Sequence, residues 1–456
     1  GLGDVYKRQS MKRTGWLFLL IFTLILSSCS SSNEESASDT TKTQDVTITL
    51  TQKETCEKLA NIICDGDIQA LQNDFTYLDE MGKAVKEKNF QTQIMSFSKS
   101  CGSVVSLQTP YAQSYQGNVA VFQPVITQKQ KFNLQVTFAG DKIAGIFFRP
   151  YQLPEETMKM DGIKQKEMDL KIATGGNIKG YLCTPEKGDK FPVVILLGGS
   201  GPSDHNETIG NQKPFYELAK ELGKQGIATY RFDKRTLENT FTQTDTIQQE
   251  YIEDALSAIQ LMQQQKQIDK QRIYVLGHSQ GGYILPRLNE QTKDVAGYIF
   301  MAAPSRPIED SMVEQLTYLA KLDGKVDAEE QKQLDEAETV RKQIKQIASS
   351  KHDDTLYLGM TRAYLMDLAT YDPVKTAEKI QVPVLLCQGL RDYQVTKTDL
   401  KRWQQAFAEK ANWTIRTYAT ANHAMSKGSE QPSPKDYNQE AGLDVTFVKD
   451  IVQFIK

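Results

Sequence analysis

The 456-residue sequence lacks several features that mark whole classes of protein. Its 54 lysines and arginines are interspersed with 57 acidic residues, so we expect no concentrated basic face for nucleic acid. The six cysteines show no spacing typical of a zinc site. No apolar run reaches the roughly 20 residues of a membrane-spanning helix. We therefore expect no nucleic-acid partner, no bound metal and no permanent membrane span.

A shorter apolar run near the start of the chain is typical of a secretion signal. Lys12 and Arg13 precede it, and residues 16–26 form an apolar stretch of about eleven residues, within the range of signal peptides. We predict a signal peptide over residues 11–28. Residues 1–10 precede it and fit no part of such a signal, so we interpret them as an artefactual leader.

The end of this segment, Leu26-Ser27-Ser28-Cys29, resembles the lipobox of bacterial lipoproteins. In that family the chain is cut before the cysteine, which then carries a lipid. The resemblance implies a lipid anchor at Cys29 and a location outside the cytoplasmic membrane of a bacterium. An ordinary cleaved signal peptide with an incidental cysteine is the alternative interpretation.

Residues 29–52 are rich in serine, threonine and acidic residues and have almost no aromatic side chains. Such a stretch cannot bury enough apolar area to offset the entropy lost on ordering. We therefore predict a flexible tether between Cys29 and the first folded domain.

A small α+β domain is predicted over residues 53–150. Apolar residues at intervals of three and four near its start predict a helix, and several β-rich runs follow. The strict alternation over residues 132–138 predicts a strand with one solvent-facing side. An oxidising location would permit a disulfide among Cys56, Cys64 and Cys101, although the sequence does not reveal the pairing.

The pattern changes after a predicted linker over residues 151–165. Over residues 166–456, strand-like runs alternate with helical ones, which predicts a mostly parallel sheet flanked by helices. Residues 191–197 are continuously apolar, as expected of a strand covered on both faces. The stretch 305–370 interrupts the alternation and is too long for a simple connection, so we predict a helical cap insertion.

The strongest local pattern is Gly277-His278-Ser279-Gln280-Gly281, which follows an apolar strand-like run and precedes a helix-compatible segment. A G-x-S-x-G pattern at such a junction places a serine on a sharp, strained turn, where the flanking glycines leave room for the backbone. We predict that Ser279 is a nucleophile. An ordinary glycine-rich turn is the alternative.

A nucleophilic serine needs a base to take its proton, and a third group to orient that base. The chain has only four histidines, and His423 alone follows both Ser279 and a candidate acid. That acid is Asp392, three residues after the glycine that ends an apolar run. The chain order serine, aspartate, histidine is one of the known triad orders. We predict a catalytic triad of Ser279, Asp392 and His423.

The glycine-rich loop over residues 198–202 follows the apolar run 191–197. By position, we expect the backbone amides of Ser200 and Gln280 to stabilise a developing oxyanion. A phosphate-binding loop is the alternative, but the G-x-x-x-x-G-K-[ST] pattern is absent.

With these motifs in place, residues 166–456 resemble the α/β-hydrolase superfamily, and the segments 230–235 and 392–395 fit the same group. Many relatives begin the glycine loop with His-Gly, where this chain has Gly198. The region 53–150 resembles a domain of unknown function, similar to the NTF2-like fold, that precedes such hydrolases in bacterial lipoproteins.

The resemblance implies an α/β-hydrolase that cleaves a carboxylic ester, or a related acyl bond, of a small molecule through an acyl-enzyme and without a cofactor. A peptidase or an acyltransferase on the same fold remains an alternative, because the acyl-enzyme is common to all three. An alternative of another class is a non-catalytic surface lipoprotein that binds a ligand.

Overall fold

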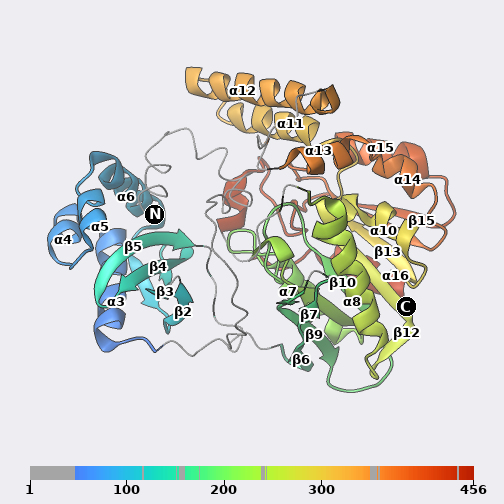
Figure 1. Cartoon of the computed structure of the whole chain (residues 1–456), viewed down its shortest axis with the longest axis horizontal. Coiled ribbons are helices and arrows are strands. Elements are labelled where there is room, and N and C mark those ends of the chain that lie inside the picture. Colours follow the sequence, from blue (N-terminus) through green and yellow to red (C-terminus); the bar gives the residue numbers. More distant parts are fainter. Residues whose placement is uncertain are drawn as a thin grey trace.

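The computed structural model describes residues 47–456 except 116–117, 150, 152, 154–159, 174, 238–241, 243, 350–356, 358–359 and 439–440. The predicted leader, signal peptide, Cys29 and most of the tether lie outside the described residues. The rest forms a smaller α+β domain followed by a larger α/β domain (Figure 1). No helix in the described ranges combines the length and the hydrophobicity that crossing a membrane requires.

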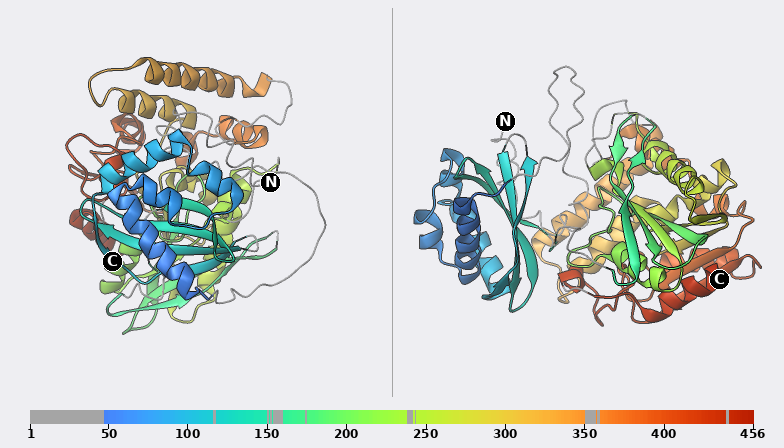
Figure 2. Two further views of the ribbon diagram at one scale, coloured as in Figure 1. Left: turned by 90° about the vertical axis from the view of Figure 1, so that its left-hand side faces the viewer. Right: turned by 90° about the horizontal axis from the view of Figure 1, so that it is seen from below.

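The first domain packs helices on one face of an antiparallel sheet, and the other face of the sheet turns toward the second domain (Figure 2). The strand order is β1-β3-β4-β5, with β2 paired to β3. The elements are α3 (Leu50–Asp65), α4 (Ile68–Asn73), α5 (Asp79–Ala84), α6 (Lys88–Cys101), β1 (Val104–Leu107), β2 (Tyr111–Tyr115), β3 (Asn118–Thr127), β4 (Lys131–Ala139) and β5 (Lys142–Arg149).

The folded region begins a few residues earlier than the predicted tether boundary at residue 52. The Thr49 side chain accepts from the Gln52 amide, and the Gln52 side chain accepts from the Thr49 amide, which forms a capping box. This reciprocal pairing satisfies backbone donors that a helix start otherwise leaves free, so α3 begins at Leu50.

The structure contradicts the predicted solvent-facing side of the strand over residues 132–138, which is β4. Its polar residues Asn133, Gln135 and Thr137 are buried, as are the apolar residues between them. The Asn133 amide donates to the Tyr111 hydroxyl at 2.8 Å, and the Arg149 guanidinium donates to Gln135 at 2.7 Å. Neighbouring side chains thus cover this face of the central strand and supply hydrogen-bond partners, which alternation alone does not reveal.

The five cysteines in the described part of the chain are all buried, and none forms a disulfide. Burial raises the pKa of the Cys56 thiol to about 12. Cys387 lies in the core of the second domain, and burial likewise raises the pKa of its thiol to about 12. These thiols therefore behave as small apolar side chains in the core.

The second domain is built on an eight-stranded sheet in the order β15-β14-β13-β12-β10-β11-β9-β6. Strands β10 to β15 pair in parallel, whereas β9 and β6 at one edge are antiparallel. The strands are β6 (Ile163–Glu167), β9 (Gly180–Pro185), β10 (Phe191–Leu197), β11 (Ala228–Phe232), β12 (Ile268–His278), β13 (Gly297–Met301), β14 (Val384–Gly389) and β15 (Trp413–Tyr418).

The continuous apolar run in β10 is explained by helices on both faces of the sheet. Val193 and Ile195 belong to the core cluster that also includes side chains of α8 (Glu253–Gln263) and α15 (Lys397–Phe407). Val194 and Leu196 point the other way, toward α7 (Pro214–Lys224) and α16 (Val445–Ile455). Because successive side chains in a strand alternate between faces, a strand between two helical layers must be apolar throughout.

The predicted insertion is helical. It contains α11 (Ile308–Ala320), α12 (Ala328–Lys345) and α13 (Arg362–Ala369), and Figure 1 shows α11 and α12 as an antiparallel pair above the sheet. Asp327 and Glu330 form a capping box that fixes the start of α12. Met312 and Leu316 of α11 and Leu365 of α13 belong to the core of the second domain, so the cap is packed onto the domain.

One asparagine joins the two domains. The Asn211 side-chain amide donates to the carbonyl oxygens of Lys131 in β4 and Asn438, at 2.8 and 2.6 Å. Its side-chain oxygen accepts from the amide of Tyr151, between the domains, at 2.9 Å. A single side chain therefore contacts the first domain, the connection and the second domain.

Candidate active site

Ser279 stands at the junction of β12 and α9 (Gln280–Tyr283), in a backbone conformation that is rare for a residue with a side chain. Its φ is 53° and its ψ is −120°. The Ser279 amide donates to the Met301 carbonyl at the end of β13, at 2.8 Å, which holds the strained turn in place. Such strain is retained where the surrounding structure fixes it, and it is typical of functional residues.

The two glycines of the pattern are required by close backbone contacts. A Cβ on Gly277 would lie 2.1 Å from the Gly281 carbonyl oxygen, and a Cβ on Gly281 would lie 2.4 Å from the Leu197 carbonyl oxygen. Both distances are far below any van der Waals contact. The turn can therefore form only with glycine at these positions.

Asp392 and His423 lie beyond the carboxyl ends of β14 and β15, and they are joined directly. Asp392 Oδ2 is 2.7 Å from His423 Nδ1, and both side chains are buried. Asp392 Oδ1 accepts from the amides of Gln394 and Val395 at 2.8 and 2.9 Å. The carboxylate is thus fixed by the loop that carries it, and it can hold the imidazole in one orientation.

Ser279 is connected to His423 through its neighbour His278. The His278 ring lies between Glu207 and His423, and its Nε2 is 2.9 Å from the His423 carbonyl oxygen. The two rings lie with their centroids 4.7 Å apart. In the described part of the chain, the Ser279 hydroxyl and the His423 ring do not make a direct hydrogen bond. In enzymes without substrate, hydrogen bonds between catalytic groups are often long.

Ser200 and Gln280 both line a cavity beside Ser279. Among the described residues, neither of their backbone amides donates to another protein group. The adjacent Gly199 amide, by contrast, donates to Glu207 Oε1 at 2.8 Å. Two free amides therefore remain next to the nucleophile, at the positions where the sequence predicts an oxyanion site.

Glu207 ties the glycine loop to the turn that carries Ser279. Besides the Gly199 amide, its Oε1 lies 2.8 Å from His278 Nδ1, and its Oε2 accepts from the Ser203 hydroxyl at 2.7 Å. Burial raises the pKa of Glu207, but the hydrogen bond and charge of His278 outweigh burial and hold it below its usual value. Burial lowers the pKa of His278, but Glu207 outweighs this and raises it. The pair therefore favours its ionised form.

Lys234 fixes the glycine loop from the other side. Its ammonium donates to the carbonyl oxygens of Gly199 and Gly201, both at 2.8 Å, and it pairs with Glu250 at 2.6 Å. Burial lowers the pKa of Lys234, which Glu250 opposes only in part. Because both neighbouring carbonyls are held, the peptide unit of Ser200 between them has a defined orientation.

Sequence reasoning missed Glu207, Lys234 and Glu250. Each acts on a residue distant in the chain: Glu207 contacts a histidine 71 positions away, and Lys234 contacts a loop 33 and 35 positions away. The one local signal is that polar residues cluster directly after the glycine loop, at 203–208. A cluster of this kind is equally typical of an exposed turn, so it does not identify the buried pair.

The cavity beside Ser279 has a volume of about 320 Å³ and lies between the sheet domain and the cap. Its lining is mainly apolar, with contributions from Met312 of α11 and Leu365 of α13. The cap also contacts the catalytic loops directly, because the Tyr364 hydroxyl accepts from the Gln280 side chain at 2.8 Å and donates to Glu250. No cluster of metal-ligating side chains occurs within the described ranges.

Comparison with known proteins finds relatives of this chain among hydrolases and esterases. A family model described as serine aminopeptidase, S33, matches residues 209–430, which include Ser279, Asp392 and His423. The esterase EstD of Thermotoga maritima is 34% identical over 320 residues, which span 69% of this chain and 74% of the relative.

Solved structures that match part of this chain include Est1E from Butyrivibrio proteoclasticus with ferulic acid bound, at 16% identity and a TM-score of 0.42, over 63% of this chain and 97% of that one. An acetyl xylan esterase from Paenibacillus matches with 14% identity and a TM-score of 0.42, over 66% of this chain and 85% of that one. From the sequence relationship to EstD, the chain belongs to the α/β-hydrolase family of serine hydrolases and is a carboxylesterase-like enzyme.

Proposed function

We propose that this enzyme hydrolyses carboxylic esters through a covalent acyl-enzyme on Ser279, with His423 as general base and Asp392 as its orienting acid. The observation that carries the proposal is the strained Ser279 turn, together with the 2.7 Å contact between Asp392 and His423. A strained serine and a histidine that a buried carboxylate holds are the components of such a triad.

In the proposed mechanism, Ser279 Oγ attacks the ester carbonyl carbon while His423 Nε2 takes the hydroxyl proton. The bond to the leaving alcohol then breaks, and His423 returns the proton to the alcohol oxygen. Water repeats the sequence on the acyl-enzyme and releases the acid. Asp392 stabilises the imidazolium that forms in each half-reaction. We expect the hydrogen bond between the Ser279 hydroxyl and the His423 imidazole to form when substrate enters the cavity.

The backbone amides of Ser200 and Gln280 are proposed to bind the oxyanion of the tetrahedral intermediate. They are free of other partners in the described part of the chain and line the cavity next to Ser279. Loss of one such donor lowers kcat by about 10²–10³. Glu207 and Lys234 are positioning residues in this scheme, because they hold the glycine loop without touching the reacting atoms.

Amide hydrolysis is a second candidate, because the matching family model is described as a serine aminopeptidase. The same triad can act on both bonds. Matched ester and amide substrates with one acyl group separate the two: an esterase turns over the ester alone at a measurable rate, whereas a peptidase turns over both.

The catalytic proposal is tested with a fluorophosphonate probe on the purified protein from residue 47 onward. Wild type should be labelled on Ser279, and Ser279→Ala should show no labelling and no ester hydrolysis. Labelling that persists in Ser279→Ala, or a folded wild type that never labels, would contradict it. Circular dichroism of the variant controls for folding.

We further propose that the enzyme is attached to the outside of a bacterial membrane through a lipid on Cys29, because residues 26–29 resemble a lipobox. Cys29→Ser, expressed as the full chain in a bacterium, should leave the membrane fraction and appear in the soluble extracytoplasmic fraction. Equal membrane association of the variant and wild type would contradict the anchor.

A further inference from the structure

A buried chain of hydrogen bonds joins the cap to both residues of the proposed oxyanion site. It runs through Lys234, Glu250, Gln280 and Tyr364, and none of these residues is more than 7% exposed. Lys234 follows β11, Gln280 begins α9, and Tyr364 belongs to α13 of the cap. Glu250 lies in a π-helical turn, Gln248–Ile252, directly before α8. Because turns of this kind occur frequently at functional sites, the contacts of Glu250 are of interest for catalysis.

Glu250 is the centre of this chain of hydrogen bonds, because its two carboxylate oxygens have different partners. Oε1 lies 2.6 Å from the Lys234 ammonium, which holds the carbonyl oxygens of the residues on both sides of Ser200. Oε2 accepts from the Tyr364 hydroxyl, whose oxygen in turn accepts from Gln280 Nε2 at 2.8 Å. One buried carboxylate therefore connects the group that orients the Ser200 amide with the side chain of Gln280.

The Tyr364 hydroxyl has one proton, so the direction of both of these hydrogen bonds is fixed. Burial raises the pKa of Tyr364 well above its ordinary value, and the neighbouring Glu250 carboxylate raises it further. The hydroxyl thus keeps its proton and donates it to Glu250, while its oxygen accepts from Gln280. Replacing this tyrosine by phenylalanine would remove both hydrogen bonds and keep the shape of the ring.

Tyr364 contacts an oxyanion residue without contacting the substrate cavity. Gln280 lines the cavity beside Ser279, whereas Tyr364 is not among the described residues that line it. The side chain of Gln280 is held at its far end by the cap, and its backbone amide is one of the two proposed oxyanion donors. Hydrogen bonds that lock a side chain in this way also limit the movement of the residue that carries it. Any effect of the Tyr364 hydroxyl on catalysis should therefore pass through Gln280.

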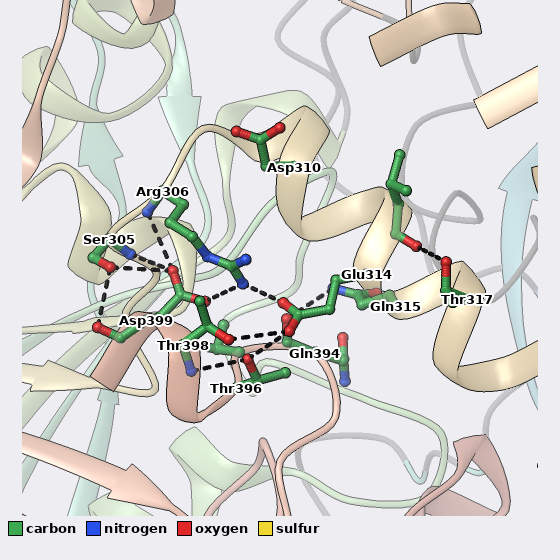
Figure 3. Close-up of polar contacts among 12 residues, drawn as sticks. Ser305, Arg306, Asp310, Glu314, Gln315, Thr317, Gln394, Thr396, Thr398 and Asp399 are labelled. Carbon is green, nitrogen blue, oxygen red and sulfur yellow. Dashed lines mark hydrogen bonds and ion pairs between the residues drawn. The ribbon is translucent and has the colours of Figure 1, made fainter. Parts of the chain in front are cut away.

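A second set of polar contacts anchors the cap at α11 and shares no residue with this chain of hydrogen bonds. Glu314 of α11 accepts from the Thr396 and Thr398 hydroxyls at 3.1 and 3.2 Å, and it pairs with Arg306 (Figure 3). These contacts attach α11 to the start of α15. The cap is thus anchored at α11 and at α13, and the α13 contact reaches an oxyanion residue.

We propose that Tyr364 is a positioning residue through which the cap holds Gln280 for catalysis, so that the cap contributes to turnover as well as to the walls of the cavity. The hydroxyl does not touch the reacting atoms; it restricts the residue whose amide binds the oxyanion. A displaced oxyanion donor weakens binding of the transition state more than binding of the substrate, so the effect falls on kcat. This role deepens the proposed function and rests on it, because it requires an oxyanion beside Ser279.

The test is a double-mutant cycle on the purified protein with 4-nitrophenyl hexanoate as substrate. Tyr364→Phe should lower kcat by about tenfold or more and change KM by less than about threefold, because a displaced donor loses part of the roughly 10²–10³ that a missing donor costs. Gln280→Met removes the other partner of the same hydrogen bond and should have an effect of similar size. Because Tyr364 acts through Gln280, the double variant should be no slower than the slower single variant.

Glu314→Gln is the matched control, because it weakens the other polar anchor of the cap and leaves the Tyr364 contact in place. It should keep kcat at the wild-type value. Circular dichroism and urea unfolding check that each variant is folded.

A wild-type kcat in Tyr364→Phe would overturn this role, as would effects of the two single variants that multiply in the double variant. An equal fall of kcat in Glu314→Gln would do the same, because general seating of the cap would then explain the loss. If Tyr364→Phe does not fold, a wild-type kcat in Gln280→Met overturns the role as well. No turnover by a folded wild type that labels with fluorophosphonate would instead count against the ester substrate, so the two failures are distinguishable.

Discussion

The two domains differ in the polar groups that they bury. The described part of the first domain buries only neutral polar side chains: Gln52, Gln123, Thr127, Asn133, Gln135 and Thr137. The second domain buries charged ones, and several of them, such as Glu207, Lys234 and Glu250, surround the glycine loop. Burying a charge is far more costly than burying an amide. The difference indicates that the second domain gives up stability to hold its catalytic loops in place.

The strongest test of the role of buried charge in the second domain is to neutralise the carboxylate that orients His423. Asp392→Asn keeps the shape of the side chain but favours the wrong tautomer of the imidazole. We expect kcat for a simple ester to fall by about 10⁴, with a small change in KM. Steady-state kinetics with a chromogenic ester measures both. A fall of less than tenfold would mean that another group orients His423.

The next largest effect should come from Glu207→Gln, which removes the charge that joins the glycine loop to His278. Since the variant would displace the oxyanion amides without removing a reacting group, we expect kcat to fall by about 10² and KM to change little. Glu217→Gln is the matched control, because Glu217 is part of a solvent-accessible pair with Lys220 on α7. An unchanged kcat in Glu207→Gln would mean that Glu207 does not position the glycine loop for catalysis.

The same variant gives a pH test. The lowered pKa of Glu207 gives a stabilisation that is present above the unfolded pKa, about 4.3, and is lost as the pH falls through the folded pKa. The raised pKa of the His278 imidazole also stabilises the folded state. This stabilisation is complete below about pH 6.5, the unfolded pKa, and is lost as the pH rises through the folded pKa. The difference in urea midpoint between wild type and Glu207→Gln should therefore be largest between about pH 4.5 and 6.5. A difference that does not vary with pH would contradict an ionised pair.

The smallest effect is expected in the first domain. The Thr127 hydroxyl lies 2.7 Å from the Cys101 carbonyl oxygen and is buried. Thr127→Val should destabilise this domain by about 1–2 kcal/mol, because it removes the buried hydroxyl that hydrogen-bonds to the carbonyl oxygens of Cys101 and Gln130. It should leave ester hydrolysis at the wild-type rate. Urea unfolding and kinetics on the same preparation check both, and a loss of activity before unfolding would mean that the domains are coupled at the active site.

Much of the site could be predicted because its signals are local. Ser279 has glycines two positions away on each side, and Asp392 and His423 follow strand-like runs in a recognisable order. The charged groups that support them could not be predicted in the same way. Glu207 and Lys234 gain their roles from contacts between distant segments, and nothing in their immediate sequence separates a buried carboxylate from an exposed one.

For the fold as well, some features follow from the local sequence, whereas others depend on contacts between segments that are distant in the chain. The apolar run 191–197 predicts a strand between two helical layers, and β10 occupies these residues. The alternation in β4 gives a wrong prediction, because Tyr111 of β2 and Arg149 of β5 cover its polar residues Asn133 and Gln135. The predicted cap is helical, but which of its side chains line the cavity becomes visible only when α11 is placed over it.

The link through Asn211 has a practical consequence for anyone who shortens this protein. Cutting the chain after the first domain would remove the Lys131 carbonyl and leave part of the Asn211 amide without its acceptor. Asn211 lies only four residues beyond Glu207, so the new freedom would arise in the segment that steadies the oxyanion amides. A low kcat in an isolated hydrolase domain would therefore indicate increased mobility of the segment around Asn211. Such a result would not by itself show that the missing domain takes part in catalysis.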